Sequence, residues 1–159
     1  MKVARVVREQ RPRVLILPYW KGRHPDHYAA SILGYEACFL AGLAKLPLPK
    51  PGPIDDPLPP HRPFKIIYAT LYYDIRPSFV VDITDQFEAR LQSIYAYKSQ
   101  FTDQQAGSCD FPAHAEIRER VATLARYYGI LAGVKYAEPF LQKEIGLVED
   151  LTLIPVKSI

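Results

Sequence analysis

The hydrophobic positions of the first 45 residues predict a helix, a strand and a second helix. Residues 2–10 are expected to form the first helix, and Pro12 should end it because its ring disfavours helix at the preceding residue. The run Val14-Leu15-Ile16-Leu17 is apolar throughout and lies between two prolines, which predicts a strand buried on both faces, as in a parallel sheet covered by helices. Apolar residues then recur with helical spacing from Tyr28 to Ala44.

The second half of the chain continues this alternation less strictly. Lys65–Ala69 and Ser78–Ile83 are rich in β-branched and aromatic residues, which predicts two more strands. Thr84 or Asp85 is the expected N-cap of the helix that follows. Apolar residues that step by four and three predict a clear helix over residues 113–131. Strands that alternate with helices indicate an α/β fold.

Eight of the 15 prolines of the chain lie between Leu46 and Pro63. Such a density prevents regular helices and sheet ladders and favours an extended chain. Residues 46–63 are therefore predicted to form a Pro-rich surface loop. A length of 159 residues and a hydrophobic content of 48% suit a single core, so one globular domain is predicted over residues 1–159.

The composition argues against several classes of partner. The formal net charge is +3, and the basic residues are scattered, so a nucleic-acid partner is not expected. No apolar stretch approaches the length of a signal sequence core or a membrane span, which favours a cytoplasmic protein without a membrane partner. Cys38 and Cys109 are too few for a disulfide framework and fit a core position and a loop thiol.

The candidate chemistry lies in Arg23-His24-Pro25-Asp26-His27, between the apolar strand and the helix that follows it. In open α/β sheets ligands bind outside the carboxyl ends of strands. Two histidines three residues apart on a helical turn project to roughly the same side, either could ligate a metal, and Asp26 could accept a ring N–H. Spacing alone favours the simpler interpretation, a polar loop with two solvated histidines and a helix-capping aspartate.

The segment Gly22-Arg23-His24-Pro25-Asp26-His27, followed by Ala29-Ala30-Ser31, resembles the second signature of the LmbE-like, or PIG-L, family of zinc-dependent N-acetylglucosaminyl deacetylases. Further segments resemble the branch that deacetylates N-acetylglucosaminyl malate in bacillithiol synthesis. They are residues 36–43, 77–84, 97–101 and 133–140. The resemblance implies a Rossmann-like sheet flanked by helices, a Zn²⁺ cofactor and a small amino-sugar substrate.

The resemblance also implies roles for single residues. By position, His27 matches the zinc-ligand histidine, His24 matches the catalytic histidine, and Asp26 matches the acid that orients an imidazole. Arg62, Tyr136 and Glu138 are the expected substrate-binding residues. Members of the family commonly assemble as trimers or hexamers, so a homo-oligomer is expected of a complete protein.

The family's first signature, a His-Pro-Asp-Asp segment after the opening strand, does not occur in this sequence. The resemblance therefore implies the C-terminal part of the fold without its N-terminal βα units, which leaves the zinc site short of ligands. Three hypotheses follow. The sequence is a fragment of a deacetylase, it is one subunit of a split enzyme, or it is a non-catalytic sugar-binding module of the same fold.

Overall fold

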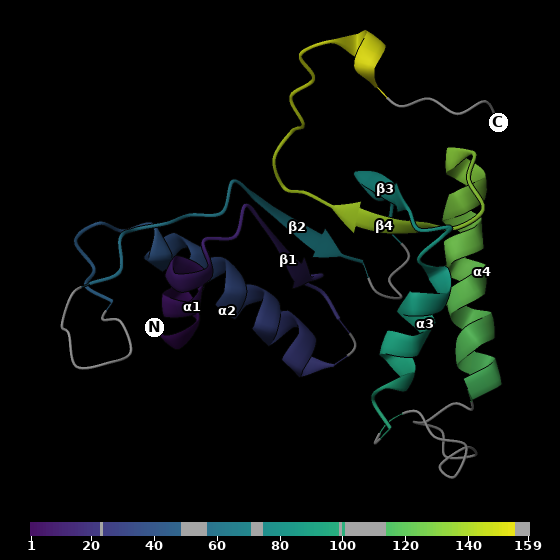
Figure 1. Ribbon diagram of the computed structural model, residues 1–159, viewed down its shortest axis with the longest axis horizontal. Coiled ribbons are helices and arrows are strands. Elements are labelled where there is room, and N and C mark those ends of the chain that lie inside the picture. The colour runs from purple at the N-terminus through teal and green to yellow at the C-terminus, as the bar shows by residue number, and fades with distance from the viewer. Residues whose placement is uncertain (23, 49–56, 71–74, 99, 101–113, 155–159) are drawn as a thin grey trace. The chain divides into compact units, whose positions relative to one another are not determined.

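The computed structural model describes residues 1–22, 24–48, 57–70, 75–98, 100 and 114–154 (Figure 1). The chain divides into two compact units. The first unit comprises Met1–Ser78 and Phe140–Ile145, and the second comprises Phe79–Pro139 and Gly146–Ile159. A single domain over residues 1–159 stays a prediction, so each unit is described by itself.

The first unit is a β-α-β arrangement with an additional helix at its start. It contains α1 (Lys2–Gln10), β1 (Val14–Pro18), α2 (Pro25–Ala41) and β2 (Lys65–Ala69). Parallel strands need a long crossover connection, and α2 supplies it between β1 and β2. The two strands pair in parallel, from Val14 opposite Lys65 to Pro18 opposite Ala69. The end of β4 (Ala137–Leu141) joins β2 in the antiparallel direction, with Leu141 opposite Tyr68.

The first unit has its own core between α1, α2 and the sheet. Its buried members are Ala4, Val7, Ala37, Cys38, Ala41 and Leu48, against which Leu15, Leu40 and Ile66 pack. Helix α1 ends as predicted before Pro12, because Arg11 takes a left-handed conformation with φ 46° and donates its N–H to the Val7 carbonyl.

Arg8 lies within this core although it carries a charge. It is 2% exposed and its guanidinium donates hydrogen bonds to the carbonyls of Ala41, Leu43, Leu46 and Leu58 at 2.6–3.0 Å. The contact satisfies carbonyls at the end of α2 and fixes both ends of the Pro-rich segment. Leu48 and Leu58 of that segment are buried, while residues 49–56 lie outside the described part of the chain.

The second unit packs two helices against a short strand. It contains β3 (Phe79–Asp82), α3 (Phe87–Tyr95), α4 (His114–Ala132), the first part of β4 and a short 3-10 turn, η2 (Leu151–Leu153). Its buried core consists of Ile83, Phe87, Leu91, Ile117, Val121 and Ala125. After α4, Gly133 takes φ 70°, the left-handed conformation expected at a helix end.

The start of α3 differs from the prediction. The N-cap is Gln86 and not Thr84 or Asp85. The reason is that the Asp82 carboxylate accepts hydrogen bonds from the backbone N–H of Thr84 at 3.0 Å and from its hydroxyl at 2.6 Å. Thr84 therefore belongs to a local turn that comes before the helix, and it does not cap the helix.

Among the described strands, hydrogen bonding follows the order β1-β2-β4-β3, so β1 is an edge strand. The strand over residues 14–17 was predicted, but burial on both of its faces is wrong. Val14 is 46% exposed and Ile16 is 56% exposed, because no described residues cover that face of β1. Strand β4 was not predicted, since Pro139 interrupts its apolar pattern and proline is unusual in strand interiors.

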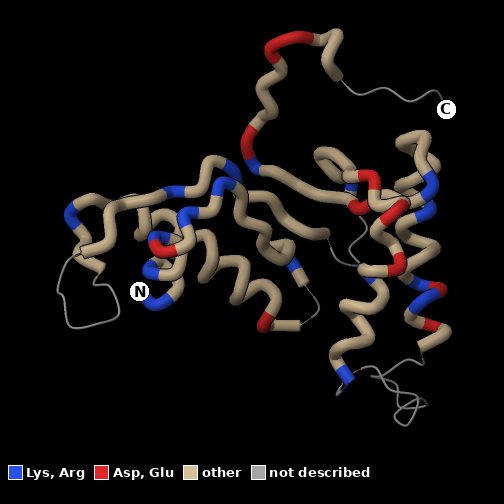
Figure 2. The backbone as a smooth tube through the Cα atoms, viewed as in Figure 1, with Lys and Arg blue, Asp and Glu red and all other residues tan. Residues whose placement is uncertain are grey.

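Charged residues follow the pattern expected from the sequence. Lys and Arg occur in both units, and α3 and α4 each carry both Arg and Glu (Figure 2). Of the helices that the structure describes, none combines the length and hydropathy needed to cross a membrane.

Candidate active site

The sequence-predicted site lies where the connection from β1 enters α2. His24 is the N-cap of α2, in extended conformation with φ −97° and ψ 133°, and Pro25 occupies the first helical position. Proline is favoured there because its missing N–H would have no intrahelical partner. The His24 Nδ1 atom accepts a hydrogen bond from the Asp26 backbone N–H at 3.2 Å, so an imidazole does the capping that a serine or aspartate usually does.

This cap determines which ring nitrogen of His24 carries the proton. An Nδ1 atom that accepts a hydrogen bond is unprotonated, so the neutral imidazole has its proton on Nε2. The Asp26 carboxylate lies 3.7 Å from the same Nδ1 atom, too far for a good hydrogen bond. The sequence suggested that Asp26 accepts a ring N–H; in this structure its backbone N–H donates to the ring instead. His24 can therefore present an Nε2–H donor to a ligand.

His27 lies one turn later on the same side of α2. The ring centroids of His24 and His27 are 5.9 Å apart, and the His27 N–H donates to the His24 carbonyl at 3.1 Å. Gly22 approaches this turn closely, because a Cβ atom at Gly22 would lie 3.2 Å from the His27 Cβ. The structure thus brings the two predicted imidazoles together, and Gly22 is a further positioning residue that sequence reasoning gave no separate role.

The site has few candidate ligands for a metal. In the described ranges no group of three or more His, Cys, Asp or Glu side chains is arranged to hold a metal ion. His61 makes a hydrogen bond between its Nε2 atom and the Pro12 carbonyl at 2.9 Å, and His114 stacks on Tyr95 with centroids 4.4 Å apart. A catalytic zinc site usually has three protein ligands. His27 fits one of these positions because its exposed imidazole makes no hydrogen bond through its ring to a described residue.

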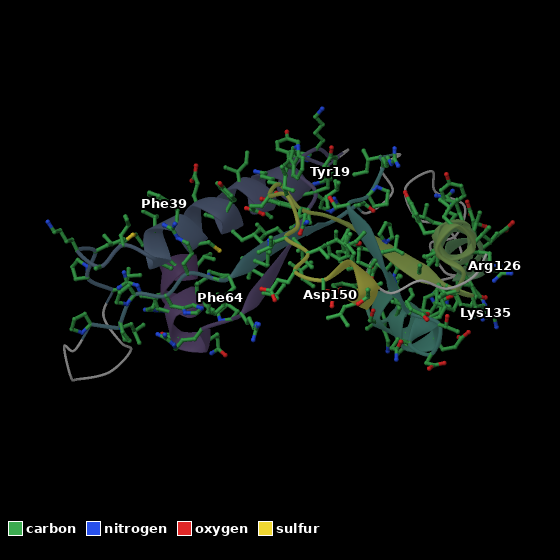
Figure 3. All side chains as sticks on the ribbon, turned by 90° about the horizontal axis from the view of Figure 1, so that it is seen from above. Tyr19, Phe39, Phe64, Arg126, Lys135 and Asp150 are labelled. Carbon is green, nitrogen blue, oxygen red and sulfur yellow. The ribbon has the colours of Figure 1, made fainter. Side chains whose placement is uncertain are left out.

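Arg62 does not lie with the two histidines. Its guanidinium packs 5.1 Å from the Phe39 ring centroid and donates to the Phe39 carbonyl at 3.4 Å. Phe39 and His24 are roughly 20 Å apart along α2 at the rise of about 1.5 Å per residue of an α-helix; Figure 3 shows Phe39 on this helix and Tyr19 before its start. Burial raises the pKa of the neighbouring Cys38 thiol, and the positive charge of Arg62 opposes that rise. A substrate role for Arg62 stays a prediction.

Tyr136 and Glu138 belong to the second unit, where each has a contact of its own. Tyr136 stacks on Phe87 with centroids 4.0 Å apart and ring planes 13° from parallel. Glu138 forms an ion pair with Arg90 at 3.2 Å. Their substrate-binding roles stay predictions.

The comparison with known proteins shows what this chain resembles. No family model matches it. The chain is 32% identical over 142 residues to the diacetylchitobiose deacetylase of Thermococcus kodakarensis, in an alignment that covers 86% of this chain and 47% of the relative. The chain therefore spans about half the length of the curated relative that it matches.

Solved structures give the same result. A conserved protein of Thermus thermophilus matches with a TM-score of 0.74 at 34% identity, over 93% of this chain and 60% of that one. The N,N'-diacetylchitobiose deacetylase of Pyrococcus horikoshii, solved with an inhibitor, matches with a TM-score of 0.64 at 25% identity, over 87% of this chain and 48% of that one. The chain has the fold of these deacetylases. The predicted α/β class, with helices flanking a sheet, is confirmed.

The fold alone does not select the reaction. The 4-carboxy-2-hydroxymuconate hydratase of Pseudomonas putida matches with a TM-score of 0.65 at 18% identity, over 94% of this chain and 60% of that one. Function must therefore be argued from the site and from the deacetylase homologues.

Proposed function

We propose that this chain provides part of the active site of a zinc-dependent deacetylase that acts on an N-acetylglucosaminyl sugar. One observation carries the proposal. The imidazoles of His24 and His27 lie together at the carboxyl end of a parallel strand, in a chain 32% identical to a diacetylchitobiose deacetylase. This is the position where open α/β sheets bind ligands.

The residues of this site would divide the work of amide hydrolysis. Zinc supplies Lewis-acid chemistry at the acetamide carbonyl when it is bound. His27 would hold the metal. The partial positive charge at the N-terminus of α2 would favour the negative charge that develops on the carbonyl oxygen. His24, with its proton on Nε2, would donate a hydrogen bond to the developing oxyanion. Asp26 would keep the His24 ring in this orientation through its backbone N–H, which donates to Nδ1.

Two amino sugars are the candidate substrates. The sequence resemblance favours N-acetylglucosaminyl malate of bacillithiol synthesis, whereas the comparisons favour N,N'-diacetylchitobiose, the substrate named for two of the similar proteins. Both carry the same acetamide on a glucosamine ring, so the two histidines would act alike on either. Substrate choice would depend on groups beyond the acetamide, for which Arg62, Tyr136 and Glu138 are our candidates.

We further propose that the remaining zinc ligands and the carboxylate base come from residues outside this sequence. They would lie in the part of the similar proteins that this chain does not span, either in a longer form of the same polypeptide or in a separate subunit. On the resemblance alone, the proposal also includes a cytoplasmic location and assembly of the complete protein into trimers or hexamers.

The first experiment separates metal binding from turnover. Zinc content and deacetylase activity are measured for the chain after it is mixed with, or fused to, a polypeptide that carries the His-Pro-Asp-Asp signature, with both candidate sugars as substrates. His27→Ala should lower zinc content and activity together. His24→Asn should retain zinc and lower turnover by about 10²-fold or more, the loss that follows removal of one hydrogen-bond donor to the oxyanion.

Asparagine is the matched change at position 24 because its side-chain oxygen also caps helices, so α2 keeps its N-terminus while the imidazole is lost. Equal zinc content in the wild type and in His27→Ala would contradict the ligand assignment. Sugar binding without zinc and without hydrolysis in every mixture would favour a non-catalytic binding module.

A further inference from the structure

Four side chains of the first unit, none of them one of the two histidines, form a cluster. The Lys143 ammonium lies 4.2 Å from the ring centroid of Tyr35, 5.1 Å from that of Trp20 and 5.2 Å from that of Tyr68. Trp20 and Tyr68 meet edge to face with centroids 4.8 Å apart. We call these three rings the aromatic cage. It joins the connection after β1, the middle of α2 and the end of β2.

Packing of a lysine side chain does not require three aromatic rings around its ammonium group. A cation over a ring face is attracted by the ring quadrupole, and cages of several rings are used to recognise ammonium ligands. Among the described residues, Lys143 forms no ion pair with a carboxylate, so the rings are its described partners. The cage is therefore suited to a cation.

The cage also contains an unsatisfied polar group. Tyr68 is 1% exposed, and its hydroxyl is buried without a hydrogen-bond partner. Buried hydroxyls in native proteins normally have a partner, because an unsatisfied one costs free energy. Tyr35, in contrast, is 45% exposed, so the cage is open to solvent on the side of α2.

We propose that the aromatic cage is a binding site for the ammonium group of a deacetylated amino sugar, and that Lys143 occupies it when no sugar is bound. The choice of ligand rests on the proposed function. Deacetylation converts a neutral acetamide into a protonated amine, so a cation-selective cage distinguishes the product from the substrate. Tyr35 lies about two helical turns beyond His27 on α2, so the cage uses other side chains than the two histidines.

Trp20 is the only tryptophan of the chain, so its fluorescence reports directly on the cage. The chain is titrated with glucosamine, at a pH where its amine is protonated, and with N-acetylglucosamine as the neutral control, both with a chelator present so that no hydrolysis occurs. Lys143→Gln removes the ammonium that competes with the sugar for the cage. Because the tethered Lys143 ammonium acts at a millimolar effective concentration, the variant should bind glucosamine roughly tenfold more tightly than the wild type. N-acetylglucosamine should leave the fluorescence unchanged.

Two further variants make the result specific. Tyr35→Leu, combined with Lys143→Gln, removes an exposed wall of the cage and should abolish the tighter binding. Lys135→Gln is the matched control, because the Lys135 ammonium lies over one ring only, 5.3 Å from the Tyr136 centroid in the second unit. It should bind glucosamine as the wild type does.

The proposal is overturned if Lys143→Gln shows no saturable response to glucosamine, or responds equally to the neutral sugar. Neither result affects the zinc and activity measurements on the two histidines. Conversely, selective glucosamine binding would support the cage even if the deacetylase test failed.

Discussion

The buried hydroxyl of Tyr68 shows how one side chain can be both a cost to the fold and an indication of function. Burial is the main cause that raises its pKa to about 12, and the nearby Tyr35, Glu144 and Cys38 add to the rise. A tyrosine in an unfolded chain has a pKa near 10. Between about pH 10 and 12 the unfolded state therefore loses this proton before the folded state does, and the free energy of unfolding falls as the pH rises.

Tyr68→Phe tests this at the residue scale. At neutral pH we expect the free energy of unfolding to rise by about 1 kcal/mol, because an unsatisfied buried hydroxyl is removed. Above pH 10 the variant should lose stability less steeply than the wild type. Urea unfolding over a pH series measures both effects, with Tyr97→Phe, at an exposed position, as the control. A wild type and a Tyr68→Phe variant with parallel pH profiles would contradict the prediction.

Single residues of the site were predictable to different degrees. The proximity of His24 and His27 could be predicted from the sequence because they lie three residues apart at the start of a helix, while their roles in the site rest on the resemblance. The orientation of the His24 ring could not, since it depends on which backbone N–H is free at the helix start. The packing of Arg62 on Phe39 could not be predicted either, because it depends on the path of the Pro-rich segment.

At the scale of elements, Arg8 links segments that are distant from one another in the sequence. Its guanidinium binds carbonyls at the end of α2 and in both described ends of the Pro-rich segment. A helical pattern in residues 2–10 predicts α1 but gives no reason to bury an arginine. The acceptors are backbone carbonyl oxygens of distant residues, so the pattern of side chains along the sequence could not predict these hydrogen bonds.

Arg8→Met keeps a long apolar side chain and removes the donors. We expect the free energy of unfolding to fall by about 3 kcal/mol, since several buried carbonyls lose a charged partner. Proteolysis within residues 46–63 should also become faster, because their anchoring is lost. Lys2→Met, an exposed cation of the same helix, is the control and should change stability by no more than about 0.5 kcal/mol. Equal urea midpoints for the two variants would show that the Arg8 contacts contribute little.

Most elements could be predicted because their signals are local. Strand β2 was predicted with its observed bounds, and α4 within one residue at each end. Strand β4 could not be predicted, because its pairing with β2 is a contact between distant positions and Pro139 hides its pattern. The apolar composition of residues 14–17 correctly predicted a strand. The burial of their side chains could not be predicted in the same way, because it depends on which other elements pack against β1.

At the scale of the whole chain, the exposed face of β1 is the feature that sequence reasoning and structure describe differently. An edge strand with free backbone groups and exposed apolar side chains is a template for association with another chain. Helix α2 separately exposes Ile32, Leu33 and Phe39, each more than half exposed. The chain spans about half the length of a relative that it matches, and the exposed face of β1 is where we expect a further element to pack.

Ile16→Lys tests that expectation on the chain by itself. A lysine on an edge strand opposes pairing through its charge and its hydration. The wild type should therefore sediment with a concentration-dependent increase in mass that Ile16→Lys reduces. Phe64→Lys replaces a side chain that is 78% exposed but lies just before β2, and it should associate as the wild type does, because an isolated apolar side chain presents no free strand edge. Equal association of all three proteins would place the contact elsewhere, and loss of association in Phe64→Lys alone would assign it to that side chain instead of the edge of β1.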